Sequence, residues 1–223
     1  MTFSIKLLPT ILLWGLSIVF FRTFLYAEST ENSGDKNESS IILFDGKSLD
    51  DWKLTDYAGK GDVEIDQNGS LVIEMGAELS GIHWKGRNLP KVNYEITLEA
   101  MRTMGSDFFC GLTFPYVESH ATLILGGWGG ALIGISSLDD FDASENETGD
   151  VYAFEDFKWY KVRLRVTEKD LKVWLDEQMV IDCEVEDRKV GMRFGEIEMS
   201  VPLGITTYAT TGKFRKVFLK PLL

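Results

Sequence analysis

Basic residues are scarce in this sequence: 23 Lys and Arg stand against 35 Asp and Glu in 223 residues. The resulting net charge of −12 excludes nucleic acid as the main partner, because phosphate binding needs a basic surface. Downstream of residue 27 no apolar span reaches 20 residues, so no membrane-spanning helix is expected there. Proline is also rare, at five residues, whereas 21 Gly and 12% aromatic residues favour strands and tight turns.

The short signatures of common catalytic sites are missing as well. The sequence contains no GxSxG, HExxH, CxxC or P-loop motif, and no GxGxxG followed by a helix that would indicate a dinucleotide site. Its only histidines, His83 and His120, are either isolated surface residues or two ligands of a metal site completed by a carboxylate. Its only cysteines, Cys110 and Cys183, leave open a disulfide or two small buried core residues.

The N-terminus carries an uncharged apolar run over residues 7–21. Lys6 precedes this run and Ala27 is a plausible cleavage point, so residues 1–27 predict a secretory signal peptide. An uncleaved membrane anchor is the alternative, because Arg22 interrupts the cleavage region. Both alternatives predict an exported protein, periplasmic or extracellular.

The next segment, residues 28–40 (ESTENSGDKNESS), has no aliphatic or aromatic side chain. Such a composition cannot bury apolar surface and predicts a flexible linker. We therefore expect the folded domain over residues 41–223.

Apolar stripes of period two dominate the rest of the chain. Residues 159–186 hold three such stripes separated by short polar turns, a pattern typical of an antiparallel meander. Further strands are expected at residues 70–75, 94–101, 108–114, 121–125, 132–135 and 212–219. No amphipathic pattern of three helical turns is present. We predict an all-β fold of two antiparallel sheets, for which a jelly-roll sandwich fits the length.

Both ends of this domain resemble one known family. LFDGKSLDDW at residues 43–52 resembles the LFDGxSLxGW opening of the 3-keto-disaccharide hydrolase family, also described as 3-keto-glucoside lyase and hydratase. FRKV at residues 214–217, with LKPL at residues 219–222, resembles its FRNIxIxPL close. Residues 94–102 are similar to the family's strand that ends in an acidic residue followed closely by Arg, and residues 204–205 to its GxIGLQ strand.

The resemblance implies a concanavalin A-like jelly roll in an exported bacterial protein. It also implies cleavage of 3-keto-glycosides, by a hydrolase or by a lyase and hydratase that acts through β-elimination. The middle of the chain departs from the family pattern. Residues 105–111 read GSDFFCG where the family carries an Asn-Ser-Gly, and LILG at residues 123–126 replaces an acidic–Gln–Ile–Leu–Asp segment. We therefore predict a divergent member, with a non-catalytic carbohydrate-binding or cell-surface interaction module as the alternative.

Elimination from a 3-keto sugar needs a base, a group that stabilises the enolate, and an acid. We predict Glu99 and Arg102 as the catalytic residues, with Glu99 as the base and either Arg102 or a divalent metal, Ca²⁺ or Mn²⁺, on the keto oxygen. Strand alternation places Glu99 opposite the apolar stripe, whereas Arg102 has the other parity unless a bulge intervenes. An ordinary Glu–Arg pair on a solvated strand is the alternative.

Four residues are predicted to bind the sugar. Trp128 lies among four glycines in the stretch GGWGG, where a tight turn exposes the ring for stacking, unless the ring caps the core. Arg163 and Trp174 share the polar face of the meander, a strip that suits a carbohydrate unless a loop covers it. Asp107 offers a carboxylate to sugar hydroxyls.

An acidic loop over residues 139–150 holds six carboxylates. Asp139, Asp140 and Asp142 are the candidate metal ligands, because Ca²⁺ prefers hard oxygen donors. The loop lacks EF-hand spacing, so a solvated loop and the rim of a sugar site are the alternatives.

Overall fold

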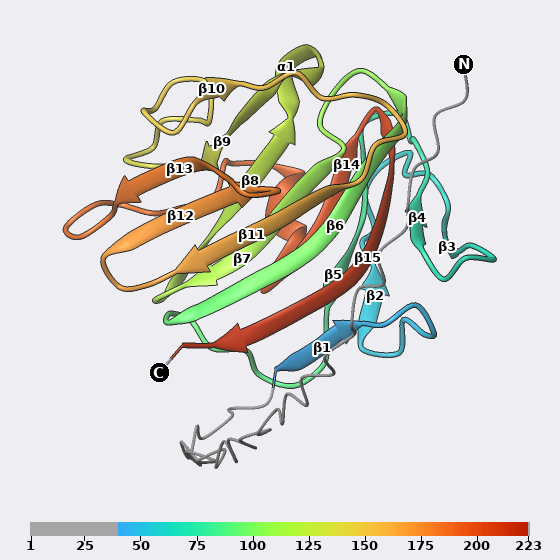
Figure 1. Cartoon of the computed structure of the whole chain (residues 1–223), viewed down its shortest axis with the longest axis horizontal. Coiled ribbons are helices and arrows are strands. Elements are labelled where there is room, and N and C mark those ends of the chain that lie inside the picture. The colour runs from blue at the N-terminus through green and yellow to red at the C-terminus, as the bar shows by residue number, and fades with distance from the viewer. Residues whose placement is uncertain (1–39, 223) are drawn as a thin grey trace, which may run out of the picture. The chain divides into compact units, whose positions relative to one another are not determined.

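The computed structural model describes residues 40–222. The predicted export signal, and the predicted linker up to residue 39, lie outside the described residues. No helix within residues 40–222 is long and apolar enough to cross a membrane. The chain forms two antiparallel sheets that face each other (Figure 1), as the period-two pattern predicts.

The first sheet has eight strands in the order β13-β12-β11-β6-β15-β4-β3, with β1 also beside β15. Its strands are β1 (Ile41–Phe44), β3 (Val63–Ile65), β4 (Leu71–Ile73), β6 (Tyr94–Gly105), β11 (Tyr160–Val166), β12 (Asp170–Leu175), β13 (Gln178–Glu184) and β15 (Thr210–Pro221). The two longest strands, β6 and β15, pair at its centre although they lie far apart in the sequence. The predicted meander is confirmed as β11, β12 and β13.

The second sheet has seven strands in the order β10-β9-β8-β7-β14-β5-β2. Its strands are β2 (Trp52–Leu54), β5 (Leu79–Trp84), β7 (Cys110–Tyr116), β8 (Ser119–Gly126), β9 (Leu132–Ser136), β10 (Asp150–Val151) and β14 (Gly204–Tyr208). The helical elements are a four-residue turn, α1 (Gly127–Gly130), and a 3₁₀ helix, η1 (Glu196–Ser200).

The main core lies between the two sheets and takes every second residue of the strands. In β6 and β11, for example, Ile96, Leu98, Val162 and Leu164 are all buried and belong to one hydrophobic cluster. Their neighbours in sequence point to the outside of the eight-stranded sheet. This alternation is what an antiparallel sheet with one buried face requires.

A smaller apolar cluster lies on the outer face of the seven-stranded sheet. It contains Leu79, Phe108 and Ile124, with Tyr208 packed against them. Residues 185–203, the long connection between β13 and β14, cross this face, and we call them the crossing segment. Its helix η1 packs against β5 and β14. The outer face of this sheet is therefore partly covered, which gives it room for a hollow site.

The two cysteines are free and buried, so the disulfide alternative is not formed. Cys110 lies in β7 with no exposed surface, and burial raises the pKa of its thiol to about 12. Both cysteines act as small core residues.

A matched pair of phenylalanines tests this account of the core. Phe109 is fully buried and makes an edge-to-face contact with Phe154, whereas Phe194 is 93% exposed. We expect Phe109→Ala to lower the free energy of unfolding by about 3–5 kcal/mol, because it leaves a cavity. Phe194→Ala should change it by less than about 0.5 kcal/mol. Urea unfolding measures both, and equal effects would contradict the described core.

Candidate functional site

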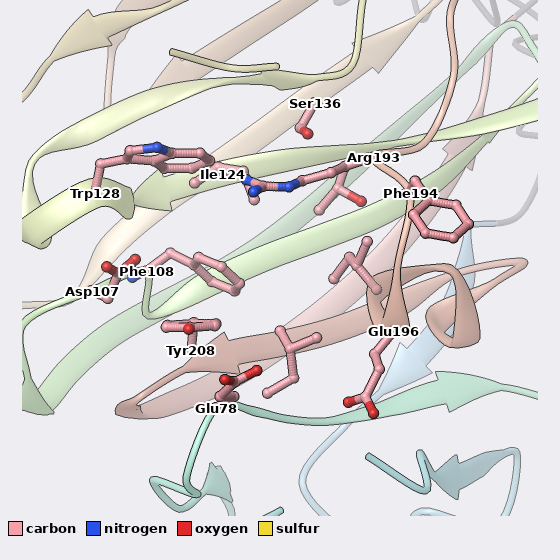
Figure 2. Close-up of a pocket in the computed structure, with 13 residues that line it drawn as sticks. Glu78, Asp107, Phe108, Ile124, Trp128, Ser136, Arg193, Phe194, Glu196 and Tyr208 are labelled. Carbon is pink, nitrogen blue, oxygen red and sulfur yellow. Dashed lines mark hydrogen bonds between the residues drawn. The ribbon is translucent and has the colours of Figure 1, made fainter. Parts of the chain in front are cut away.

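A pocket of about 420 Å³ opens on the outer face of the seven-stranded sheet (Figure 2). Strands β5, β14, β8 and β9 contribute its base, and its walls come from the β6–β7 loop, the α1 turn and the crossing segment. Its volume lies within the ordinary range for small-molecule sites. The outer face of this sheet thus has a pocket that can hold a ligand.

The base of the pocket is apolar and aromatic. Leu79 and Ile124 point outward from β5 and β8, and the rings of Phe108 and Tyr208 lie 5.8 Å apart at a tilt of 40°. Apolar ring surfaces with a few polar groups around them match the amphipathic faces of a sugar ring.

Trp128 forms one wall of the pocket and is 45% exposed. The glycine-rich turn places it there: Gly126, Gly129 and Gly130 all have positive φ, and Trp128 itself has φ of 47°. A Cβ on Gly130 would lie 2.8 Å from Nη1 of Arg102, so this position admits no side chain without a shift of its neighbours. The prediction of an exposed Trp in a tight turn is confirmed.

The crossing segment forms the opposite wall and carries Arg193 and Phe194. The guanidinium of Arg193 donates to Asp142 Oδ2 at 2.5 Å and lies 5.5 Å from the centre of the Trp128 ring. Asp142 in turn accepts from the Ser136 hydroxyl at 2.5 Å. Arg193 is therefore held at the pocket by a carboxylate that is itself fixed to β9.

Three carboxylates line the pocket. Asp107 accepts hydrogen bonds from the amides of Phe108, at 2.8 Å, and Gly129, at 3.3 Å. Glu78 and Glu196 are exposed and form no ion pair with any residue between 40 and 222. The pocket thus offers acceptors for sugar hydroxyls and two carboxylates whose charge no partner neutralises within the described chain.

The structure does not bring the predicted catalytic residues together. Glu99 points outward from the eight-stranded sheet and binds Arg215 at 2.6 Å and Lys216 at 2.8 Å. Arg102 points to the other side of the sheet, where it binds Asp156 at 2.5 Å. A β-bulge between Glu99 and Arg102 would turn both side chains to one face. The bulge in β6 instead lies between Arg102 and Met104.

Neither residue lines the pocket, so the prediction of one catalytic pair is corrected. Arg102 is buried and also donates to the carbonyls of Gly130 and Phe154, both at 3.0 Å. It supports the turn that carries Trp128. Burial opposes the ionisation of Glu99, but hydrogen bonds from Lys216 and Arg215 outweigh it and lower its pKa. Glu99 is therefore a fixed anion between two cations.

The four predicted sugar-binding residues divide between two faces. Trp128 and Asp107 line the pocket, and the turn brings them close enough for Asp107 to bind the Gly129 amide. Arg163 stacks over the Trp174 ring at 3.6 Å, but both belong to the outer face of the eight-stranded sheet. That pair is therefore a separate feature.

The acidic loop does not fit a metal site. Asp139 binds Arg188 at 2.8 Å, Asp140 binds Lys189 at 2.6 Å, and Asp142 binds Arg193. Cations of the crossing segment thus already neutralise the carboxylates that Ca²⁺ or Mn²⁺ would need. No group of three or more His, Cys, Asp or Glu side chains suited to a metal occurs within residues 40–222.

The two histidines are also apart. His83 lies in β5, hydrogen-bonded with Thr55 at 2.9 Å, and His120 lies in β8. Two strands separate them, so their backbones are about 14 Å apart at about 4.8 Å per strand. The pKa of each histidine is lowered, mainly by burial and to a smaller extent by a nearby lysine. They do not form a shared metal site.

Five pocket residues that the sequence pattern does not predict come from the crossing segment and its neighbours: Glu78, Arg193, Phe194, Glu196 and Tyr208. One available signal is the length of the crossing segment. Its 19 residues make it the longest connection between consecutive strands in residues 40–222. Connections of that length in compact domains are often functional.

The sequence of almost all of the described chain matches one protein family. Residues 39–220 match the family described as the 3-keto-alpha-glucoside-1,2-lyase-like domain. No curated protein matches the sequence. The match covers the whole sandwich, including both walls of the pocket.

Solved structures support the fold at low sequence identity. The carbohydrate-binding module CBM66 from Bacillus subtilis is 15% identical with a TM-score of 0.50, covering 76% of this chain and 95% of its own. Crh5 transglycosylase in complex with NAG is 12% identical with a TM-score of 0.55, covering 82% and 84%. SCLam, a non-specific endo-beta-1,3(4)-glucanase of family GH16, is 10% identical with a TM-score of 0.52, covering 82% and 87%. These similarities confirm the predicted jelly-roll fold.

The pH dependence of stability tests whether Glu99 forms ion pairs with Arg215 and Lys216. Its lowered pKa stabilises the fold above the unfolded value, near 4.5, and this contribution is lost as pH falls through the folded value. We expect Glu99→Gln to lower the free energy of unfolding by about 1 kcal/mol at pH 7, and by progressively less as pH falls through the folded pKa of Glu99. Urea unfolding between pH 7 and pH 3 measures the difference in free energy of unfolding between the wild type and Glu99→Gln. A difference that does not change with pH would contradict the ion pairs.

Proposed function

The chain belongs to the 3-keto-alpha-glucoside-1,2-lyase-like domain family, and from that membership we propose that it is an exported protein that binds and cleaves 3-keto-glycosides in the pocket between Trp128 and the crossing segment. The observation that carries the proposal is the pocket itself. It combines exposed aromatic rings, a fixed guanidinium and carboxylates on one concave face.

Binding follows from the shape and polarity of this pocket. The ring of Trp128 offers a stacking surface on one wall, and Phe194 offers another on the opposite wall (Figure 2). Asp107, already oriented by two amides, accepts hydrogen bonds from sugar hydroxyls. Stacking on apolar ring faces, with a few oriented polar groups, is how proteins fix the orientation of such ligands.

The same pocket holds groups for elimination. A carboxylate, Glu78 or Glu196, takes the proton from C2 of the 3-keto sugar, and the electron pair forms an enolate whose oxygen Arg193 stabilises. The enolate then expels the substituent oxygen from C1, which takes the proton from the protonated carboxyl group, directly or through a water, and leaves as an alcohol. Water adds across the resulting double bond to give the free 3-keto sugar. Every step uses groups of this chain and water.

A second candidate function is a non-catalytic carbohydrate-binding module. The position of Glu99 and Arg102 favours it, because the residues that match the family's acidic strand are engaged in ion pairs away from the pocket. In that case the pocket binds glycosides without turnover.

Export is proposed from the N-terminal sequence. The apolar run over residues 7–21 with the preceding Lys6 supports it. Fractionation of cells that produce the full chain tests it: we expect the protein outside the cytoplasm, and a purely cytoplasmic protein would overturn this part of the proposal.

A proton NMR time course with a 3-keto-glucoside tests cleavage. We expect new product signals from the wild type, and loss of at least about 100-fold in rate for Glu78→Gln or Glu196→Gln, whichever removes the base. Glu99→Gln is the matched control and should retain the wild-type rate. Broadened substrate lines without products would favour the binding module, and full activity in both pocket variants would contradict the assigned base.

Trp128 and Trp174 form a matched pair for binding. Trp128→Ala should weaken glycoside binding by about 1–3 kcal/mol through loss of ring burial. Trp174→Ala removes an indole from the other sheet and should leave this affinity unchanged. Isothermal titration calorimetry separates the two, and an equal loss for both variants would argue against binding in the pocket.

A further inference from the structure

The outer face of the eight-stranded sheet carries a concentration of positive charge. We call the outward side chains of its central strands, β11, β6 and β15, the basic face. Its cations are Lys161, Arg163, Arg165, Lys213, Arg215, Lys216 and Lys220, and its carboxylates are Glu95 and Glu99. Seven of the 23 basic residues therefore meet three of the 35 acidic residues here, because Lys213 also pairs with Asp66 at 2.9 Å. The rest of the protein is strongly acidic, so the charge is segregated.

Cross-strand register explains how the charges are arranged. Glu95 on β6 lies between Arg165 on β11 and Lys220 on β15, and Glu99 lies between Lys161 and Arg215 in the same way. Each carboxylate thus has a cation on either side. The arrangement leaves a surplus of cations along β11 and along β15, two lines about 10 Å apart at ordinary strand spacing.

Part of this surplus has no partner in the described chain. Lys161 and Lys220 are exposed and form no ion pair with residues 40–222. Arg163 has only a long contact, 3.4 Å, to Glu95, which already binds Arg165 at 2.9 Å. These cations remain available to an external anion.

Two tryptophans accompany the cations. Arg163 stacks over Trp174 at 3.6 Å, and Arg215 stacks over Trp159 at 4.1 Å. Stacking holds each guanidinium flat and leaves its edge to donate hydrogen bonds: Arg215 uses part of that edge on Glu99, and Arg163 makes only the long contact to Glu95. Both rings are half-buried, so they still offer apolar surface beside the cations.

The face is hollowed between these groups. A cavity of about 280 Å³ is lined by Thr97 and Phe218, by Lys161, Arg163 and Lys216, and by three carboxylates, Glu99, Asp176 and Glu177. Glu99 is neutralised by Arg215 and Lys216, and Asp176 and Glu177 belong to the β12–β13 turn at one rim. Asp176 and Glu177 therefore place negative charge on that rim, and Lys161 and Arg163 of β11 line the hollow beside it.

We propose that the basic face is a second binding site, for a polysaccharide that carries carboxylate or sulfate groups. Charge complementarity selects an anion, and the tryptophans beside the cations select one with sugar rings. A hollowed sheet with cations about 7 Å apart along β11 suits a linear chain of charged sugars better than a flat lipid surface. The site lies on the sheet opposite the pocket and does not depend on the proposed cleavage reaction.

Affinity electrophoresis of the purified full-length protein tests this site. Polygalacturonate in the gel should retard the wild type at low salt, uncharged dextran should not, and the effect should weaken as salt rises. Lys161→Gln/Lys220→Gln should reduce the affinity by about fivefold, as expected for two exposed charge contacts. Lys53→Gln/Lys85→Gln makes the same change in net charge with two exposed lysines elsewhere, and should have no effect.

Several results would overturn the proposal. These are no retardation of the wild type by polygalacturonate, equal retardation by dextran, or equal losses in the two double variants. Binding to vesicles of phosphatidylglycerol without binding to polygalacturonate would instead assign the face to membranes. Trp128→Ala should keep full affinity for polygalacturonate. The proposal for the basic face can therefore fail without the proposal for the pocket failing, and the reverse also holds.

Discussion

The pocket depends on how the crossing segment is fixed to the outer face of the seven-stranded sheet. A buried chain of hydroxyls does much of this: Thr113 hydrogen-bonds with Ser200 of η1 at 2.6 Å and with Thr122 at 3.0 Å. Each such bond stabilises the fold by about 1 kcal/mol, and breaking one would strand a buried polar group. The ion pair between Arg193 and Asp142 then fixes the end of the segment that faces Trp128. The acidic loop is thus the anchor of the pocket wall.

The two sheets use their outer faces differently. On the seven-stranded sheet, small hydroxyl side chains and glycines let a segment of chain lie directly on the strands, and the pocket forms where that cover ends. On the eight-stranded sheet, long charged side chains form rows across the strands, and Lys161 and Lys220 among them are exposed. The two outer faces therefore differ in chemistry: one holds an aromatic pocket, and the other holds rows of cations.

The sequence predicts the sheets well because their signal is local. Alternation at Val162, Leu164 and Val166 is enough to place a strand and its buried face. The same rule already placed Glu99 and Arg102 on opposite faces unless a bulge intervened, and the structure has no bulge between them. Strand parity alone therefore predicts that these two side chains lie apart.

The pocket could be predicted only in part. The glycines around Trp128 indicate an exposed turn, because several of its positions need positive φ. Arg193 and Glu196 carry no such local signal. The place of η1 depends on contacts with β7 and β5, about 90 to 120 residues earlier in the chain, and Arg193 is held by Asp142, 51 residues earlier. Likewise, the acidic loop looked like a cation site because the basic partners that neutralise it lie some 50 residues away.

A crystal structure of the protein with a bound 3-keto-glycoside tests the central claim most directly. The account predicts a sugar ring stacked on Trp128, within hydrogen-bond distance of Asp107 and Arg193, on the outer face of the seven-stranded sheet. A sugar bound beside Glu99 on the other sheet, with the pocket empty at saturating ligand, would contradict it.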